Sequence, residues 1–370
     1  MDEWREMSCI EEEKGRYEMK IKGKKRVVGV ICVVVVLLLT AIPFSISAVL
    51  YETTFGRYET EEPYIRDISE FDGLEVEQVS FQSKEGNQLA GYLYTHQGSQ
   101  SYEGIIVLAH GLGGGGQNSY MNVAHYFTSN GFLVFAYDAT GNDNSEGKSV
   151  RGIPQGVEDL EQAIAYVKTD ARLKEYPICL FGHSWGGYSV ANILNFCPEI
   201  KAVVSCSGFN RSSDLIEAQG REMVGGLINI LLPYIRLYEK FKFGEYADTT
   251  AIEGFEQSDA AVYIVHSQND TTVLAEYGYE VYQQKYANDP RFQFRLFEDS
   301  GHNFVYYSDE ARKYVAQFNE AFSEYFKSHE LTKESRVEYY RENMNKQQAF
   351  ELNEELYADF LEFFRSSIAS

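Results

Sequence analysis

Residues 181–187 constrain this chain more than any other segment, because they join two regular elements through a Gly-His-Ser-Trp-Gly turn. The apolar run before the turn, residues 177–180, is typical of a buried strand, and residues 188–194 are typical of a helix. A side chain at either glycine of so sharp a turn would collide with the neighbouring strand or helix. A Gly-x-Ser-x-Gly turn between a strand and a helix makes Ser184 a candidate nucleophile, beside a helix N-terminus that favours developing negative charge.

A second turn, residues 110–116, reads His-Gly-Leu-Gly-Gly-Gly-Gly and follows an apolar run at 104–109 that predicts another strand. Glycines allow backbone N–H groups to point into a cavity without side chains in the way. No Gly-Lys-Ser or Gly-Lys-Thr follows, so the turn is not predicted to be a phosphate-binding loop. The turn is therefore a candidate source of backbone hydrogen-bond donors.

An acid and a base follow at the ends of two later predicted strands. Asp270 comes after the run 261–266, and His302 comes after the run 291–297 with a glycine beside it. The chain has seven histidines, and His302 is the one that follows the acid in a loop at a strand end. We therefore expect Ser184 to be the nucleophile and His302 the general base, with Asp270 orienting the imidazole.

These residues together resemble a known family. The chain looks like an α/β-hydrolase, in the branch that also holds serine aminopeptidase-like and monoacylglycerol-lipase-like proteins. The most specific marks are residues 110–113, 182–186, Asp270 and 301–302. The order nucleophile, acid, base is the one found in α/β-hydrolases. The resemblance covers roughly residues 74–304 and a closing C-terminal helix.

The resemblance implies an oxyanion hole formed by the backbone N–H groups of Leu112 and Trp185. It also implies hydrolysis of an ester, thioester or amide without a cofactor. One loop departs from the family pattern, since residues 142–144 read Asn-Asp-Asn and the usual arginine is missing. That difference leaves the packing of this loop open, whereas the catalytic residues are unaffected. The family does not define a substrate, because one fold supports many activities.

Predicted strands and helices alternate over most of the chain, which indicates a parallel sheet covered by helices on both faces. We predict an α/β-hydrolase domain over 74–370 with a mostly parallel eight-stranded sheet. The alternation stops at 207–259, a predicted cap whose apolar segment either roofs the site or packs on the domain. A second insertion, residues 306–350, is charged and prone to form helices. It is predicted to be a solvated hairpin, with a wall of the pocket or a partner contact as alternatives.

The N-terminal region predicts a membrane anchor. Residues 27–51 carry no charge, and a helix of that length spans roughly 37 Å, enough for a hydrocarbon core of ~30 Å. Basic residues in the tail 1–26 precede this segment, and the linker 52–73 is acidic. The tail is expected to stay in the cytoplasm and the domain to lie outside. The alternative is secretion after cleavage near residues 45–48.

The amino-acid composition excludes several classes of binding partner and substrate. The net charge of −22 argues against nucleic acid and against polyanionic substrates. There is no Cys-x-x-Cys or His-Glu-x-x-His pattern, so no metal site is predicted. The five cysteines suggest no disulfide framework. A glycosylation sequon at 269–271 would place a glycan beside the candidate acid, which favours a bacterial surface over a glycosylating compartment.

Three functions remain open from the sequence. The first is a membrane-anchored serine hydrolase, of carboxylesterase or lipase type, acting on a small apolar acyl ester. The second is a serine peptidase for short peptides, which needs a carboxylate for the free amine; Glu217, Glu222 and Glu239 of the cap are candidates. The third is a binding protein that keeps an inactive hydrolase fold. The oligomeric state is not predicted.

Overall fold

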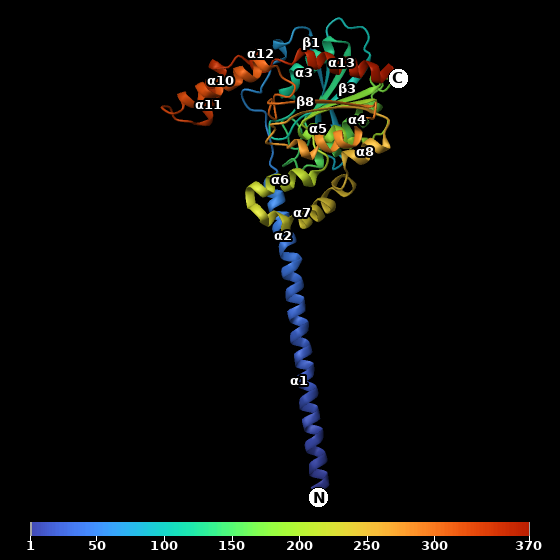
Figure 1. The fold of residues 1–370 in the computed structure, drawn as a ribbon, viewed down its shortest axis with the longest axis vertical. Helices are drawn as coiled ribbons and strands as arrows, with labels where there is room; N and C mark the ends of the chain where they lie inside the picture. The colour runs from blue at the N-terminus through green and yellow to red at the C-terminus, as the bar shows by residue number, and fades with distance from the viewer. Residues whose placement is uncertain (1, 370) are drawn as a thin grey trace.

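The computed structural model describes residues 2–369, so Met1 and Ser370, the ends of the predicted tail and domain, lie outside it. A long helical rod leads from the N-terminus to a layered domain (Figure 1). The rod consists of α1 (Asp2–Leu39) and α2 (Ala41–Thr54), separated by a break at Thr40. The C-terminal helix α13 (Glu354–Ala369) returns to the domain at the far end.

An eight-stranded sheet forms the centre of the domain. Its strands are β1 (Leu74–Gln82), β2 (Gln88–His96), β3 (Gly104–Ala109), β4 (Phe132–Tyr137), β5 (Ile178–His183), β6 (Ala202–Cys206), β7 (Ala261–Ser267) and β8 (Phe292–Phe297). Their order across the sheet is β1-β2-β4-β3-β5-β6-β7-β8. The β1–β2 and β2–β4 pairs are antiparallel, and all other pairs are parallel. This arrangement confirms the predicted fold class, and the four runs that the sequence placed as strands correspond to β3, β5, β7 and β8 to within three residues.

Helices cover both faces of the sheet because its central strands are apolar on both sides. Ile106 and Leu108 of β3 pack in one cluster with α3 (Met121–Ser129) and α13. Ile105 and Val107 point the other way and pack in a second cluster, as expected from the two-residue period of a strand. The helices of that second face are α4 (Gln155–Thr169), α5 (Trp185–Asn192), α8 (Ala251–Gln257) and α9 (Tyr279–Tyr286).

Two helical insertions lie outside these layers (Figure 1). The first contains α6 (Ser212–Val224) and α7 (Ile228–Phe243), which pack beside α2 at the base of the domain. The second contains α10 (Asp309–Tyr325), α11 (Lys333–Asn343) and α12 (Lys346–Ala349), which project sideways from the domain. Both fall within the ranges that the sequence set apart, 207–259 and 306–350.

The apolar N-terminal segment lies in one helical stretch, Met19–Thr54, that is long and apolar enough to cross a membrane. Its last part is attached to the domain rather than free. The Tyr51 hydroxyl donates to Glu239 of α7 over 2.7 Å, and Tyr51 itself is buried. The buried Ser47 hydroxyl donates to the Leu231 carbonyl over 3.4 Å. The α2 part of the rod is thus packed against the first insertion.

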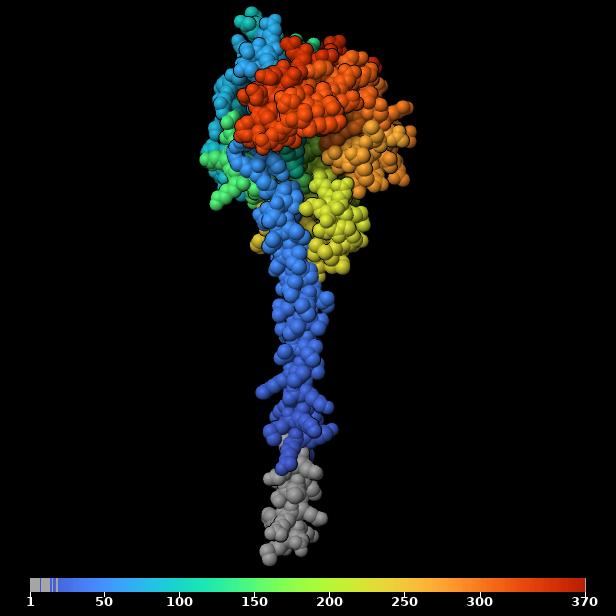
Figure 2. All heavy atoms as spheres, turned by 90° about the vertical axis from the view of Figure 1, so that its left-hand side faces the viewer, coloured from blue at the N-terminus to red at the C-terminus, as the bar shows by residue number. Residues whose placement is uncertain are grey.

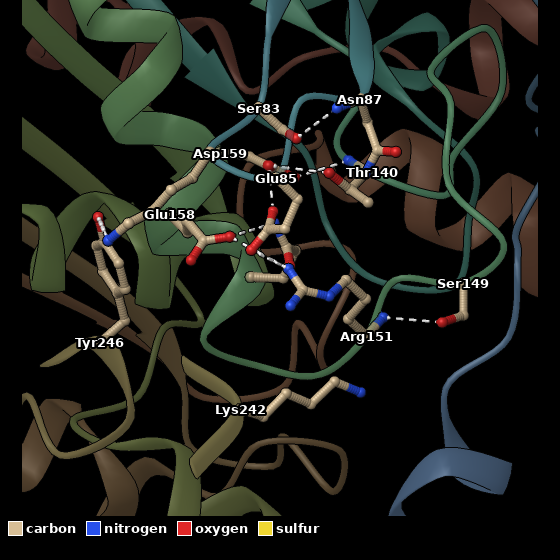
Figure 3. Close-up of polar contacts among 12 residues, drawn as sticks. Ser83, Glu85, Asn87, Thr140, Ser149, Arg151, Glu158, Asp159, Lys242 and Tyr246 are labelled. Atoms are coloured by element: carbon tan, nitrogen blue, oxygen red, sulfur yellow. Dashed lines mark hydrogen bonds and ion pairs between the residues drawn. The ribbon is translucent and has the colours of Figure 1, made fainter. Parts of the chain in front are cut away.

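A polar cluster beneath the β1–β2 hairpin fixes α4 against the sheet (Figure 3). Arg151 forms ion pairs with Glu85 of the hairpin turn and, over 3.3 Å, with Glu158 of α4. Asp159, the next residue of α4, accepts hydrogen bonds from the backbone and hydroxyl of Thr140 over 2.7 and 3.0 Å. Burial and the neighbouring Glu85 raise the pKa of Glu158 to about 8. One arginine therefore faces two carboxyl groups, and Glu158 is the one that retains a proton.

This cluster predicts a loss of stability at alkaline pH. A carboxyl whose pKa is raised by folding binds its proton more tightly in the folded state. Its contribution is therefore complete below the ordinary value of 4.5 and is lost as pH rises through about 8. Glu158→Gln should melt with the wild type at about pH 4.5 and above it at about pH 9, where each 1 kcal/mol corresponds to roughly 2–4 °C. Thermal unfolding of the full chain at both pH values measures this.

The exposed Glu175→Gln provides the matched control, because its carboxyl lies on the surface and should leave the pH dependence unchanged. Parallel loss of stability by the wild type and Glu158→Gln between these pH values would contradict the assignment of the proton to Glu158.

Candidate active site

The turn that carries Ser184 has the strained geometry that its sequence predicts. Ser184 lies between β5 and α5 with φ 58° and ψ −117°, a conformation that residues with a side chain rarely adopt. A Cβ at Gly182 would lie 2.3 Å from the Gly186 carbonyl oxygen, and one at Gly186 would lie 2.0 Å from the Ala109 carbonyl oxygen. The glycines therefore let α5 approach β3 and β5 closely enough to present the serine at the edge of the sheet.

The fold brings the three predicted side chains together. His302 Nε2 lies 2.8 Å from Ser184 Oγ, and His302 Nδ1 lies 2.7 Å from Asp270 Oδ2. An ionised carboxylate can only accept, so the Nδ1–H donates to Asp270 and Nε2 is free to accept from the serine hydroxyl. The loops after β5, β7 and β8 supply the three residues, all at the carboxyl edge of the parallel strands.

Asp270 is held as a charged group despite its burial. Burial alone would raise the pKa of Asp270, but the hydrogen bond from His302 and the favourable electrostatic interaction with that ring outweigh it, so the pKa lies below the usual value. The other oxygen of the carboxylate accepts from the backbone N–H groups of Thr272 and Val273, both over 2.9 Å. These bonds leave Oδ2 directed at the imidazole.

The glycine-rich turn is oriented by His110. The Ala139 N–H donates to His110 Nε2 over 3.0 Å, so the opposite nitrogen carries the proton and donates to the Gly111 carbonyl over 2.7 Å. Burial lowers the pKa of His110, which keeps this neutral tautomer. Because the N–H of Leu112 belongs to the same planar trans peptide, it must point away from that carbonyl. His110 thus fixes the direction of one predicted oxyanion donor.

A buried chain of hydrogen bonds links this turn to the loop of His302. The Gly111 N–H donates to the Tyr120 hydroxyl over 3.0 Å, and that hydroxyl lies 3.1 Å from His183 Nδ1. His183 Nε2 donates to the His302 carbonyl over 3.0 Å. Burial, and then the neighbouring His302, lower the pKa of His183 to about 3, so this imidazole stays neutral. Sequence analysis did not identify Tyr120, because a tyrosine in a helix start carries no signal of its own.

A cavity of about 1080 Å³ opens onto Ser184, and Leu112, Trp185 and His302 are also among its lining residues. Trp185 is the first residue of α5, so its backbone N–H has no acceptor one turn earlier in the helix. In the part of the chain that the structure describes, no hydrogen bond is found for the Leu112 N–H. The residues of both predicted oxyanion donors therefore line the same cavity as Ser184.

Much of the cavity wall comes from the linker, which the sequence did not assign to the site, and from the two insertions, for which a place at the pocket was one of the alternatives. The linker contributes residues 57–65, and α10 and α11 of the second insertion form another side. From the cap, Leu215 and Gln219 of α6 line the cavity, whereas the apolar helix α7 lies against α2. Figure 2 shows the linker, the cap and the second insertion on one face of the molecule. The second insertion is thus a wall of the pocket, one of the alternatives considered above.

The Asn-Asp-Asn segment that departs from the family pattern has a structural role. Asp143 accepts from the backbone and hydroxyl of Thr60 in the linker, both over 2.6 Å, and from the Gly116 N–H over 2.8 Å. A Cβ at Gly115 would lie 2.1 Å from the Thr60 hydroxyl oxygen, so the linker runs directly over the glycine-rich turn. Asp143 fastens the linker to that turn.

Among the residues whose side chains the structure describes, no group of three or more His, Cys, Asp or Glu has the geometry to hold a metal ion. The polar groups around Ser184 suit acyl transfer, with a hydroxyl, an imidazole, a buried carboxylate and two backbone donors.

Residues 100–322 match the family described as serine aminopeptidase, S33, and the chain belongs to that family. Together with the α/β-hydrolase fold, this membership makes the protein a hydrolase. The quorum-quenching protein AidA of Acinetobacter baumannii (strain MDR-ZJ06) is 30% identical over 103 residues, which is 27% of this chain. The match spans only 34% of that relative.

Solved structures with the same fold include an esterase and a peptidase. An esterase of Pyrococcus furiosus aligns with a TM-score of 0.51 and 17% identity, over 74% of this chain and 97% of its own. The acylaminoacyl peptidase of Pyrococcus horikoshii aligns with a TM-score of 0.50 and 15% identity, over 72% of this chain and 44% of its own. At these identities the likeness extends to the fold and leaves the substrate open.

Removal of the Tyr120 hydroxyl should disturb the site without altering the catalytic side chains. Tyr120→Phe leaves the buried Gly111 N–H and His183 Nδ1 without their partner, which costs roughly 1–3 kcal/mol of unfolding free energy. Because the turn that carries Leu112 is then free to shift, kcat should fall about tenfold or more with KM little changed. Steady-state kinetics and thermal unfolding measure both effects.

Tyr357→Phe is the matched control, since this buried tyrosine hydroxyl has no hydrogen-bond partner among the described residues. Removal of this hydroxyl should lower kcat and the free energy of unfolding by less than Tyr120→Phe does. Equal kinetics for Tyr120→Phe and the wild type would mean that the Tyr120 hydroxyl is not needed to position the glycine-rich turn.

Proposed function

We propose that this protein is a membrane-anchored serine hydrolase that cleaves a carboxylic ester through an acyl-enzyme intermediate. Ser184 is the nucleophile, His302 the general base and acid, and Asp270 the residue that orients and stabilises the imidazole. The backbone N–H groups of Leu112 and Trp185 bind the oxyanion. The substrate class is a small apolar acyl ester.

The reaction has two steps, each with a proton carried by His302. His302 Nε2 takes the proton of Ser184 as the serine oxygen attacks the acyl carbon, and Asp270 stabilises the imidazolium. His302 then gives this proton to the departing alcohol oxygen, which leaves an acyl ester on Ser184. A water molecule, deprotonated by His302, attacks the acyl group and releases the acid, and the proton returns to Ser184.

The position of the His302 imidazole is the observation that carries this proposal. Hydrogen-bond distances of 2.8 Å to the serine oxygen and 2.7 Å to the carboxylate match what a nucleophile, a base and its orienting acid require. A protein that binds a ligand without catalysing a reaction has no need of a strained serine, an ionised buried aspartate and two free backbone donors at one cavity. The hydrolase family of the chain favours the same conclusion.

For the membrane topology, we take the basic tail as cytoplasmic and the domain as extracytoplasmic. The anchor is retained in this proposal because α2 packs against the cap. Ser47 is buried against α7, so cleavage near residues 45–48 would remove the first half of a helix that the domain uses. Secretion after cleavage is the alternative.

Ser184→Ala should abolish covalent labelling of the full chain by a fluorophosphonate probe, because the probe reacts with an activated serine oxygen. Hydrolysis of p-nitrophenyl acyl esters should fall by about a thousandfold or more. Ser189→Ala is the matched control, since the hydroxyl of this serine, in the helix that follows Ser184, donates to the Trp185 carbonyl one turn earlier and takes no part in the proposed reaction. Absence of labelling in the folded wild type would favour a binding protein instead.

A serine peptidase for short peptides is the second candidate, and one carboxylate favours it. Glu217, Glu222 and Glu239 are not among the residues that line the cavity, but Glu59, Glu61 and Glu62 of the linker are. Glu61 pairs with Arg336, and Glu62 pairs with Arg341 and Lys346. Glu59 has no ion pair among the described residues, so it is available to bind a substrate ammonium group.

The two candidates predict different effects of Glu59→Gln. For a peptidase, the substitution removes the charge that binds the free amine, and kcat/KM for aminoacyl-nitroanilides should fall about tenfold. For an esterase, hydrolysis of p-nitrophenyl acyl esters should be unchanged. Assay of both substrate types with wild type and variant separates the candidates, and Glu75→Gln on the surface of β1 serves as the control.

A further inference from the structure

Helix α7 of the cap is apolar on two opposite sides. One side packs into the domain through the buried residues Ile228, Leu231, Ile235 and Phe243. The other side exposes large apolar side chains at helical spacing, Ile230 (60% exposed), Leu237 (57%) and Phe241 (84%). Met223 and Leu227, just before α7, are exposed as well. Scattered exposed apolar residues are ordinary, but a continuous stripe of this kind marks a surface that contacts something apolar.

Helix α7 lies beside α2, the helix that leaves the domain toward the proposed anchor (Figure 1). The Tyr234 hydroxyl of α7 donates to the Leu39 carbonyl, and the rings of Phe44 and Tyr238 lie 5.9 Å apart. Helix α7 therefore contacts the rod at several levels between Leu39 and Tyr51. Helix α2 also exposes apolar side chains of its own, Ile42, Ile46 and Val49.

The length of the anchor fixes where these contacts lie relative to a membrane. The charged tail ends at Arg26, and a hydrocarbon core of about 30 Å needs about 20 helical residues. Counted from Val27, the core extends to about Ile46. Helix α7 already touches the rod at Leu39 and Phe44, within that span. A straight anchor of ordinary length thus brings the outer side of α7 to the membrane surface.

The charges of α7 fit the same surface. Helix α7 carries Arg236, Lys240 and Lys242, and its one acidic residue, Glu239, is buried. Lys240 pairs with Asp248 over 2.6 Å and Lys242 pairs with Glu52, so Arg236 is the cation of α7 with no ion pair among the described residues. Apolar side chains flanked by cations and tyrosines are typical of helices that lie in the plane of a bilayer, with the cations near the lipid phosphates.

We propose that α7 and the exposed side of α2 lie in the outer interface of the lipid bilayer that holds the anchor, with Ile230, Leu237 and Phe241 inserted among the lipids. This inference rests on the anchoring in the proposed function. The insertion of α7 and α2 into the interface would hold the hydrolase domain against the membrane surface. Helix α6, which leads into α7, contributes Leu215 and Gln219 to the active-site cavity, so the cavity lies close to substrates that partition into the bilayer.

The test measures the depth of single side chains in proteoliposomes of the full chain. Phe241→Cys and Ile230→Cys are made with Cys9→Ser and Cys32→Ala, since the three other cysteines are buried. Each variant is labelled with an environment-sensitive nitrobenzoxadiazole dye. The vesicles are phosphatidylcholine, with or without acyl chains brominated near the headgroup end. Tyr325→Cys, exposed on α10, is the matched control, and extraction with alkaline carbonate reports anchoring separately.

Loss of emission from labels at 230 and 241 in brominated lipid, with the label at 325 unaffected, supports the proposal. Unquenched labels at both α7 positions in a chain that resists carbonate overturn it and leave the anchor intact. Release of the chain by carbonate overturns the anchoring and this inference together. Emission that depends on protein concentration but not on bromine overturns it in favour of a second copy on this face. Melting temperatures of the three variants verify their folding.

Discussion

The close approach of α5 to β3 and β5 is the constraint on which the rest of the site depends. It requires glycine at positions 182 and 186, since a Cβ at either would overlap a backbone oxygen. It also forces a positive φ on Ser184, a cost that the surrounding packing must offset. As a result, the serine projects from the sheet at the carboxyl edge of the parallel strands. That edge is where the loops after β7 and β8 bring Asp270 and His302 within hydrogen-bond reach.

Buried neutral histidines hold the loops around this serine. His110 fixes the peptide that carries the Leu112 N–H, and His183 connects Tyr120 to the backbone of His302. Each ring donates from one nitrogen and accepts at the other, which only a neutral imidazole can do. Burial lowers the pKa of both, so the bonding pattern persists across the ordinary pH range. The loops that line the site are therefore positioned by one connected set of hydrogen bonds.

The segments outside the hydrolase core connect the active site to the N-terminal rod. The linker after α2 crosses the glycine-rich turn, is fastened there by Asp143, and forms one wall of the cavity. Helix α6 contributes to the cavity, and α7, which follows it, packs on α2. The linker thus both attaches the rod to the domain and forms part of the pocket wall.

The sequence by itself determined the alternation of strands and helices, the turn at Ser184 and the candidates Asp270 and His302, because these depend on local periodicity, glycine sterics and chain order. It also marked the first insertion by the loss of alternation and the second by its charged, helix-prone composition. Only the tertiary structure decided that Tyr120 and His183 join two loops, that linker and α11 enclose the cavity, and that α7 packs on α2. Those are contacts between residues far apart in the chain, and the propensities of single segments do not encode which surfaces meet.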